Sequence, residues 1–412
     1  MTLFRKIQKL MCTMFILLGM TSCRWFCPDD SEEVQYDRTV LVYMAAENSL
    51  SYEIDNKGFH EQDIDEMLQA VGDIPQGSRL LIYVDDTDLP RILSVEQNKG
   101  VAECKVLHRY TAEHNSGDTE TLRLVMEWVS KHSPSSSYGL IFWSHGEAWL
   151  PAKAPIQRSI CVDNERNSYS NNGTKMDIPE VAEVLSDFPR FEFVMFDACF
   201  MQSVEVAYEL RHVTRYVLAS PAEIPNPGAP YDRMVAPLFS LPFDAEAVIM
   251  EYYRVYNDSV MSVYGYGSDR YGVSLSAINC DYLDELAAIT CEMLQKYVSK
   301  DTPTNLKGIQ RYYPLSSTSR PEYYDMNGYM HRLVTDTTEY ARWKSAFDRA
   351  VPYAVSTEWW YSNDARTQTV DLQLYGGVSC YVPQKSSIYT SLNKKFQSTS
   401  WYRAAGWDRV GW

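Results

Sequence analysis

The 412-residue sequence predicts an α/β fold in which helices flank a mostly parallel sheet. Two observations indicate this class. Short runs of aromatic and β-branched residues, typical of buried strands, alternate with amphipathic helical segments, and turn residues separate them. This alternation is typical of βαβ units around a parallel sheet. The pattern loosens after Pro230, where a C-terminal α/β extension is expected to pack on the core or to continue its sheet.

Each expected strand is a short apolar run, and each expected helix has apolar residues at helical spacing. The expected strands cover 39–46, 79–85, 102–108, 138–146, 191–199, 215–220 and 271–278, with a last β stretch at 369–382. The expected helices cover 54–71, 119–131, 178–188, 203–211, 245–256, 281–299 and 339–355. Asp118 is the expected N-cap of the second helix. A polar insertion at 150–175 has little apolar periodicity.

Residues 1–22 are expected to be a signal peptide of the lipoprotein type. Arg5, Lys6 and Lys9 form its basic start, and an apolar stretch too short to span a bilayer follows. Small residues precede Cys23, which is the expected lipidation site, similar to a bacterial lipobox. A plain secretory peptide cleaved nearby is the alternative. The rest of the chain then divides into an acidic tether (23–38), a main domain (39–235) and a C-terminal extension (236–412).

Acidic residues outnumber basic ones by 54 to 38, which gives a formal net charge of −16. Such a surface argues against nucleic acid or an anionic lipid surface as a partner. It fits cationic substrates, or it serves solubility alone. The nine cysteines are sparse and show no CxxC spacing, which argues against a disulfide scaffold and a zinc site.

Two of the expected strands end in reactive side chains, His145 on one and Cys199 on the other. If these strands are parallel neighbours, the two groups meet at the carboxyl edge of the sheet, where α/β folds place their chemistry. A cysteine hydrolase needs a thiolate, a proton donor for the leaving amine and N–H groups for the oxyanion. We therefore expect Cys199 as nucleophile, His145 as proton donor, and the backbone N–H groups of Gly146 and Cys199 as the oxyanion hole.

The segment after Cys199 is typical of a helix start, and a helix N-terminus would lower the pKa of the thiol. Taken singly, each residue has a structural alternative, a satisfied core histidine or an inert buried cysteine. The pairing of the two at neighbouring strand ends, about 50 residues apart in sequence, favours the catalytic interpretation.

Two carboxylates are candidate substrate-binding groups. Asp197 points to the same face as Cys199 by strand alternation, and a carboxylate there can pair with a lysine or arginine of a substrate. The alternative is a structural carboxylate that accepts N–H bonds from a loop. Glu223 lies just past the next strand and could be a second acid of the pocket, although its proline-rich surroundings equally suit a rigid loop.

The chain resembles the clostripain-like cysteine peptidases, which have the caspase–gingipain type of fold. The segments that carry the resemblance are 42–50, 115–122, 140–146, 196–201, 219–220 and 377–383, including Ser-His145-Gly146 and Asp197-Ala-Cys199. The resemblance implies a caspase-like catalytic core, a His145–Cys199 dyad and cleavage after arginine or lysine, with Asp197 at the specificity pocket. It also implies self-cleavage between the dyad residues, for which Lys153, Arg158, Arg166 and Lys175 are candidates.

The chain departs from the family pattern near the pocket. Glu147-Ala148 stands where the family usually has further glycine, and Ser220-Pro-Ala-Glu223 replaces an acidic pair that normally follows the serine. Both departures lie where the resemblance places the specificity pocket. No cofactor is expected to be required. Relatives in the family can depend on calcium, and the acidic loops at residues 85–88 and 163–167 are the places where this chain could hold it. Neither loop matches EF-hand spacing, so we interpret both as solvated acidic loops.

These observations predict a lipid-anchored cysteine endopeptidase of the bacterial cell envelope, on the periplasmic face or the cell surface. Its partners would be proteins or peptides with basic P1 residues, and its membrane contact would be the lipid alone. The alternative from another class is a catalytically silent binding lipoprotein on a peptidase-like fold, which would use its exposed tyrosines to hold polysaccharide or peptide.

Overall fold

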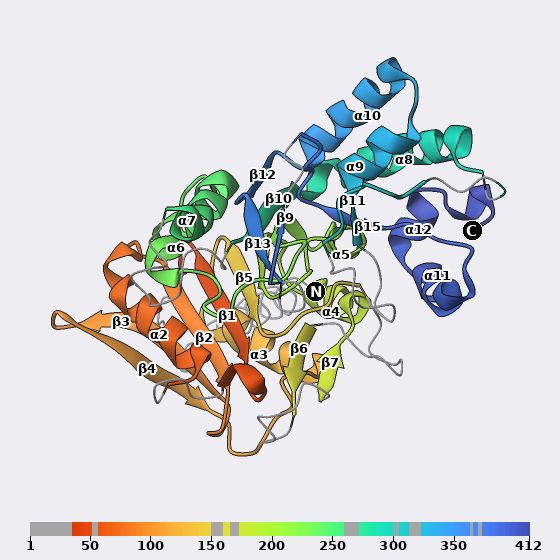
Figure 1. Cartoon of the computed structure of the whole chain (residues 1–412). Helices are drawn as coiled ribbons and strands as arrows, with labels where there is room; N and C mark the ends of the chain where they lie inside the picture. The colour runs from red at the N-terminus through yellow and green to blue at the C-terminus, as the bar shows by residue number, and fades with distance from the viewer. Residues whose placement is uncertain are drawn as a thin grey trace, which may run out of the picture. The chain divides into compact units, whose positions relative to one another are not determined.

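One large sheet organises the part of the chain that the structure describes. The computed structural model describes residues 35–51, 57–149, 160–164, 173–258, 272–299, 301, 305–312, 323–362, 366–369 and 373–412. Within the compact unit Tyr36–Trp412, nine strands pair in the order β12-β10-β9-β8-β5-β1-β2-β3-β4 (Figure 1). The expected signal peptide and the candidate lipidation site Cys23 lie outside the described residues.

The five central strands of this sheet are parallel, which confirms the predicted fold class. They are β1 (Thr39–Ala45), β2 (Arg79–Asp85), β5 (Tyr138–Trp143), β8 (Phe191–Asp197) and β9 (Thr214–Ala219). Antiparallel strands flank them on both sides: β3 (Arg91–Asn98) and β4 (Val101–Arg109) on one, β10 (Ser274–Asn279) and β12 (Tyr353–Ser356) on the other. The carboxyl ends of the central strands therefore share one edge.

Helices cover both faces of the sheet. One face is covered by α2 (Phe59–Gln69), α6 (Tyr231–Leu238) and α7 (Ala245–Asn257), which lie together in Figure 1. The other core contains residues of α3 (Thr119–His132), α4 (Ile178–Leu185), α5 (Val204–Leu210), α8 (Leu283–Tyr297), α9 (Met326–Leu333), α10 (Thr337–Ala350), α11 (Thr390–Phe396) and α12 (Ser400–Ala404). None of the helices in the described ranges is long and apolar enough to cross a bilayer.

Strand β1 shows why the sequence folds this way. Its side chains alternate between the two cores: Leu41 and Tyr43 belong to one, and Val42 and Met44 to the other. Because helices cover both faces, all seven residues of β1 are buried. A continuous apolar run, rather than an alternation of apolar and polar residues, is the pattern of such a strand.

The C-terminal part of the chain continues the sheet, since β10 pairs with β9 and β12 pairs with β10. The expected boundary between residues 235 and 236 falls inside α6. The shorter elements are the strand pairs β6 (Ile160–Asp163) with β7 (Thr174–Met176), β11 (Tyr323–Asp325) with β15 (Ser379–Tyr381), and β13 (Trp359–Ser362) with β14 (Arg366–Thr369). Single 3-10 turns are η1 (Ser49–Ser51), η2 (Val71–Asp73), η4 (Cys280–Tyr282), η5 (Ser387–Tyr389) and η6 (Asp408–Val410).

Most expected elements agree with the observed ones, but the sequence analysis missed several, among them β3, β12, α6 and α9. The helix expected at 339–355 ends at Ala350 as α10, and β12 begins at Tyr353. Strand β3 contains arginine, serine, glutamate and asparagine among its apolar residues, because it forms a hairpin with β4 whose outer half is exposed. Helix α6 starts directly after Pro230 and contains Pro237, which masks its helical pattern. The predicted N-cap is confirmed, since the Asp118 side chain accepts the Glu120 N–H.

Candidate active site

Neighbouring parallel strands deliver His145 and Cys199, as the sequence predicts. Strand β5 pairs with β8 in a register that places Trp143 opposite Asp197, the last residue of each strand. Each candidate catalytic residue follows its strand by two positions. The Ser144 N–H continues the pairing by donating to the Asp197 carbonyl at 3.4 Å. Both side chains therefore leave the sheet at the same edge.

A turn, rather than a helix, presents Cys199. Strand β8 ends at Asp197, and α5 begins only at Val204, with Ser203 as its N-cap. Phe200 in this turn has a left-handed backbone with φ +64°, a conformation that costs energy for a bulky residue and is often found at functional sites. The expected helix 203–211 agrees with α5, but the segment directly after Cys199 is not the start of that helix, because local hydrogen bonds hold it in a turn.

The segment after β9 holds this turn in place. The N–H of Phe200 donates to the Ala222 carbonyl, and the N–H of Gln202 donates to the Ser220 carbonyl, both at 2.9 Å. These two bonds attach the nucleophile turn to the loop that carries Glu223. These hydrogen bonds therefore fix the turn that carries the Cys199 thiol relative to the loop that carries the Glu223 carboxylate.

The thiol of Cys199 is partly exposed and lies in an acidic setting. Burial raises its pKa to about 12, and the Glu223 carboxylate adds to the increase, as do Glu147 and Asp197. The N–H of Ile224, 3.4 Å from the sulfur, acts in the opposite direction. The expectation of a lowered thiol pKa is therefore wrong for the protein without substrate, because no helix N-terminus offsets the burial and the nearby negative charges.

The end of β1 holds the imidazole of His145. The Ser49 hydroxyl lies 2.9 Å from Nε2 of His145. Asn48 fixes this segment by donating to the carbonyls of Ala45 and Val162 at 2.8 and 2.9 Å. Sequence analysis did not identify Ser49 as a site residue. The available signal was its position four residues past the end of a strand that neighbours β5.

Gly146 fits against the nucleophile turn without space for a side chain. A Cβ at this position would lie 2.9 Å from the Ala198 Cβ and the Met201 sulfur, and 3.0 Å from the Cys199 carbonyl oxygen. The backbone after His145 and the backbone around Cys199 are therefore in direct contact. This close approach is the structural reason for glycine at position 146.

Asp197 is buried, with 4% of its surface exposed. Its carboxylate accepts the Ala229 N–H at 3.1 and 3.2 Å and the Tyr231 hydroxyl at 3.2 Å. Burial raises its pKa to about 6, against the effect of these hydrogen bonds. This is the arrangement described by the structural alternative, in which a carboxylate accepts N–H bonds from a loop. Glu223, by contrast, is partly exposed beside the thiol.

Of the candidate self-cleavage residues, Lys153, Arg158 and Arg166 lie outside the described residues. Lys175 is the middle residue of β7, which pairs with β6.

Of the two loops considered for calcium, only the loop at residues 85–88 is fully described. There, Asp86 is already bound by Arg91 at 2.8 and 2.9 Å, whereas Asp85 lies with Glu47 and Glu113, their carboxylate oxygens within 4.8 Å of one another.

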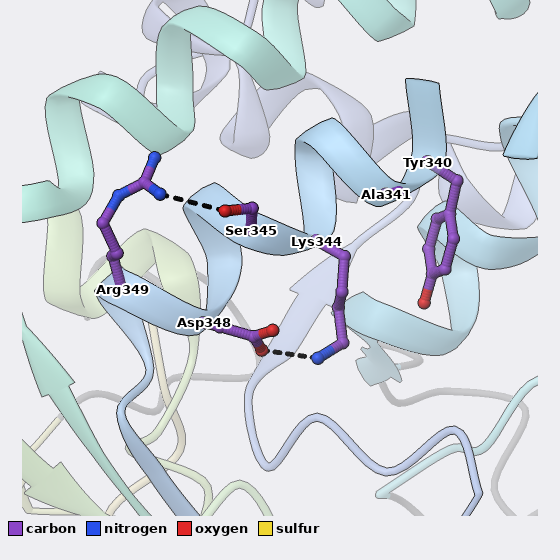
Figure 2. A pocket seen from close by; sticks show the side chains of 6 residues that line it. All are labelled: Tyr340, Ala341, Lys344, Ser345, Asp348 and Arg349. Atoms are coloured by element: carbon purple, nitrogen blue, oxygen red, sulfur yellow. Dashed lines mark hydrogen bonds and ion pairs between the residues drawn. The ribbon is translucent and has the colours of Figure 1, made fainter. Parts of the chain in front are cut away.

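A surface hollow away from His145 and Cys199 is not a candidate active site. It follows one side of α10, and Figure 2 shows its lining residues, which are Tyr340, Ala341, Lys344, Ser345, Asp348 and Arg349. Arg349 donates to the Ser345 hydroxyl at 3.0 Å, and Lys344 pairs with Asp348. The helix packs chiefly against α8. None of the expected site residues lines this hollow.

Comparisons with known proteins agree with the predicted fold and family. The model of the Clostripain family matches residues 42–412. Clostripain from Hathewaya histolytica is 25% identical over 224 residues, which are 48% of this chain and 41% of that protein. The matched part of this chain thus spans about two fifths of the length of that curated relative.

Two solved structures are similar over nearly the whole chain. A secreted C11 cysteine protease from Bacteroides thetaiotaomicron, in complex with an irreversible peptide inhibitor, is 32% identical, with a TM-score of 0.76 over 91% of this chain and 100% of that one. An inactive zymogen C11 protease from Parabacteroides distasonis is 28% identical, with a TM-score of 0.74 over 90% of this chain and 98% of that one.

Proposed function

Because the chain belongs to the clostripain family of cysteine peptidases, we propose that it is an active endopeptidase with Cys199 as nucleophile and His145 as general acid and base. The observation that supports this most strongly is the β5–β8 register, which brings both side chains to one edge of the sheet. The direct contact between Gly146 and the Cys199 turn strengthens the argument. Both side chains are also partly exposed, as a group that meets a substrate must be.

The proposed reaction has two halves. His145 takes the proton of the Cys199 thiol as the sulfur forms a bond to the scissile carbonyl carbon, and it gives that proton to the leaving amine as the C–N bond breaks. Water then attacks the thioester and passes a proton to His145, which returns it to the sulfur as the C–S bond breaks. The backbone N–H groups of Gly146 and Cys199 are the proposed donors to the negative oxygen of each tetrahedral intermediate.

A basic P1 residue is the proposed specificity. Three nearby carboxylates raise the pKa of the Cys199 thiol through their negative charge: those of Glu223, Glu147 and Asp197. A lysine or arginine bound beside the thiol would offset that charge and so favour the thiolate. Because the carboxylate of Asp197 is bound by the loop at Ala229, we assign Glu223 the larger part in contacting the substrate cation.

Self-processing and lipid anchoring are further parts of the proposal. The Parabacteroides distasonis relative is an inactive zymogen, which supports activation by cleavage in this chain as well. Cleavage is proposed at one of Lys153, Arg158, Arg166 or Lys175.

The basic and apolar start of the sequence supports export, and Cys23 is the proposed lipid attachment site in the cell envelope. The intact mass of the mature protein would test both, because lipid adds mass and cleavage divides the chain.

An active-site label tests the proposed peptidase directly. A thiol-reactive peptide inhibitor with lysine at P1 is expected to label the wild-type protein and the Cys104→Ala variant, but not the Cys199→Ala variant. Cys104 is the matched control because it is the other partly exposed free cysteine among the described residues. The His145→Ala variant is expected to lose peptide hydrolysis. Equal labelling of all variants, or none of the wild type, would favour the alternative of a silent binding lipoprotein.

A further inference from the structure

A strand pair from the C-terminal part of the chain contacts both segments that follow the proposed catalytic residues. Strand β11 pairs with β15 in an antiparallel register that places Tyr323 opposite Tyr381. All six residues of the pair are buried, and only 1% of the Tyr323 surface is exposed. This buried pair is therefore packed against the edge of the sheet where His145 and Cys199 lie.

The first contact is with the turn that carries the nucleophile. The ring of Tyr323 packs against the ring of Phe200, the residue directly after Cys199, with 5.9 Å between their centroids. On the other strand of the pair, the Ser379 N–H donates to the Gln202 carbonyl at 2.9 Å. The strand pair thus supports the left-handed turn at Phe200 in addition to the bonds from residues 220 and 222.

The second contact is with the segment after His145. The hydroxyl of Tyr323 donates to the Glu147 carbonyl at 3.2 Å, across 176 positions of sequence. The ring of Trp149 packs edge-on against the ring of Tyr381, with 5.4 Å between their centroids. Ala148, between these two residues, is fully buried and has a left-handed backbone with φ +58°. Such a conformation persists only where surrounding contacts hold it.

The proposed oxyanion hole requires a link between these two segments. Its donors, the N–H groups of Gly146 and Cys199, belong to different loops, and the β5–β8 register reaches only Trp143 and Asp197, two residues before each catalytic residue. Oxyanion donors act at about 2.7–3.1 Å from the developing negative oxygen. A small shift of one loop against the other would therefore weaken the stabilisation of the tetrahedral intermediate.

We propose that Tyr323 is a positioning residue of the peptidase, whose ring on Phe200 and hydroxyl on the Glu147 carbonyl hold the two oxyanion donors at a fixed separation. This role rests on the proposed function. Tyr323 acts through the backbone of the two loops and has no assigned contact with substrate. The C-terminal part of the chain thus contributes to the geometry of a site whose reactive groups all come from the first half.

The alternative role for Tyr323 is simple filling of the core, and Tyr312 is the matched control for it. Tyr312 is also 1% exposed, and its N–H donates to the Tyr323 carbonyl at 2.9 Å. Its hydroxyl donates to the Asp325 carboxylate at 2.6 Å rather than to a catalytic loop. Tyr312→Phe and Tyr323→Phe therefore each remove one buried hydroxyl at the same strand pair, and only the second removes a contact with the His145 segment.

The test compares three reactions of the full mature chain. In Tyr323→Phe, kcat for a lysine-P1 peptide is expected to fall about tenfold with little change in KM. A peptide aldehyde with lysine at P1 adds the Cys199 sulfur to its carbonyl carbon while its oxygen gains the proton, and its affinity is expected to fall about tenfold as well. Alkylation by iodoacetamide, in which the sulfur displaces iodide and no oxyanion forms, is expected to keep the wild-type rate.

Tyr312→Phe is expected to keep wild-type kcat and aldehyde affinity, although its thermal midpoint falls. If Tyr323→Phe does not fold, Phe200→Leu, which removes the ring on which Tyr323 packs, takes its place with the same expected losses. Wild-type kcat and aldehyde affinity in Tyr323→Phe, or equal losses in Tyr312→Phe, would overturn the proposal. Slower alkylation in Tyr323→Phe would contradict a role at the oxyanion hole. A wild-type protein that neither hydrolyses the peptide nor binds the aldehyde would refute the peptidase itself, which distinguishes the two failures.

Discussion

The Ser49 hydroxyl lies 2.9 Å from Nε2 of His145, so the segment after β1 holds the imidazole that β5 delivers. This contact joins two strands that pair directly in the sheet. A histidine that exchanges protons with a sulfur and an amine must keep one ring orientation, and a hydrogen bond to one ring nitrogen restricts it. Ser49 is therefore a positioning residue for the proposed reaction.

Replacing Ser49 with alanine is expected to lower kcat for a lysine-P1 peptide about tenfold with little change in KM, since the imidazole loses its hydrogen bond but remains present. Ser49→Thr keeps a hydroxyl and is expected to restore much of the rate. The pH–rate profile is the decisive measurement, because its limb that reports His145 should move in Ser49→Ala. Ser51→Ala is the control, as its hydroxyl donates to the Asn48 carbonyl instead. An unchanged profile with parent-like kcat would remove Ser49 from the mechanism.

Glu223→Gln is expected to change thiol reactivity and substrate turnover in opposite directions. The Glu223 carboxylate raises the pKa of Cys199, so its neutral counterpart should lower that pKa and speed alkylation by neutral iodoacetamide at a given pH. The same substitution should lower kcat/KM for a lysine-P1 peptide about tenfold or more, equivalent to about 1.4 kcal/mol, because the substrate cation loses a partner.

The two assays together distinguish the proposed role of Glu223 from simple damage to the site. A misfolded site would slow both reactions, whereas loss of the carboxylate charge should speed one and slow the other. Glu180→Gln, at an exposed position in the first turn of α4, should leave both rates at wild-type values. Unchanged turnover of basic peptides in Glu223→Gln would contradict its assignment to the specificity pocket.

The sequence alone could place His145 near Cys199 because parallel strands have few arrangements. Both residues end apolar runs in a βαβ pattern, and neighbouring parallel strands end at one edge. The sequence alone also identified Asp118 as an N-cap, because helix capping depends on a few adjacent residues.

The features that sequence missed depend on contacts between distant segments. The left-handed Phe200 and the non-helical turn between Cys199 and Ser203 follow from hydrogen bonds to residues 220 and 222. Ser49 reaches His145 across 96 positions, and its one signal in the sequence is its place after a strand that neighbours β5. The raised pKa of Cys199 likewise comes first from burial and then from Glu223, which lies on another loop. Spacing along the chain does not report such effects.

Gly146→Ala is expected to abolish most peptidase activity, by about a hundredfold or more, with a smaller effect on folding. The added Cβ would lie 2.9–3.0 Å from Ala198, Met201 and the Cys199 carbonyl, so the nucleophile turn must shift. A displacement of this kind takes the sulfur and the oxyanion donors away from productive geometry. Peptide hydrolysis and the thermal midpoint would be measured on the same preparations. Gly72→Ala is the control, because its Cβ would contact nothing within 4 Å.

Buried acids are expected to make the fold less stable as pH rises. Burial raises the pKa of Glu66 to about 8 from its usual 4.5, with Asp232 adding to the increase. Below the unfolded value the carboxyl is protonated in both states, and this contribution is fully present. Between the two values unfolding releases a proton, so stability falls as pH rises and the contribution is lost as pH passes about 8.

Glu66→Gln should therefore flatten the decline in unfolding free energy between about pH 5 and about pH 8, by a few kcal/mol at most, since each displaced pKa unit corresponds to about 1.4 kcal/mol. The glutamine oxygen can still accept the Tyr231 N–H that Glu66 binds at 2.9 Å, so the substitution removes the titration and keeps the contact. Urea unfolding at several pH values measures the effect, with the exposed Glu127→Gln on α3 as control. Parallel pH profiles for wild type and Glu66→Gln would show that Glu66 titrates alike in both states.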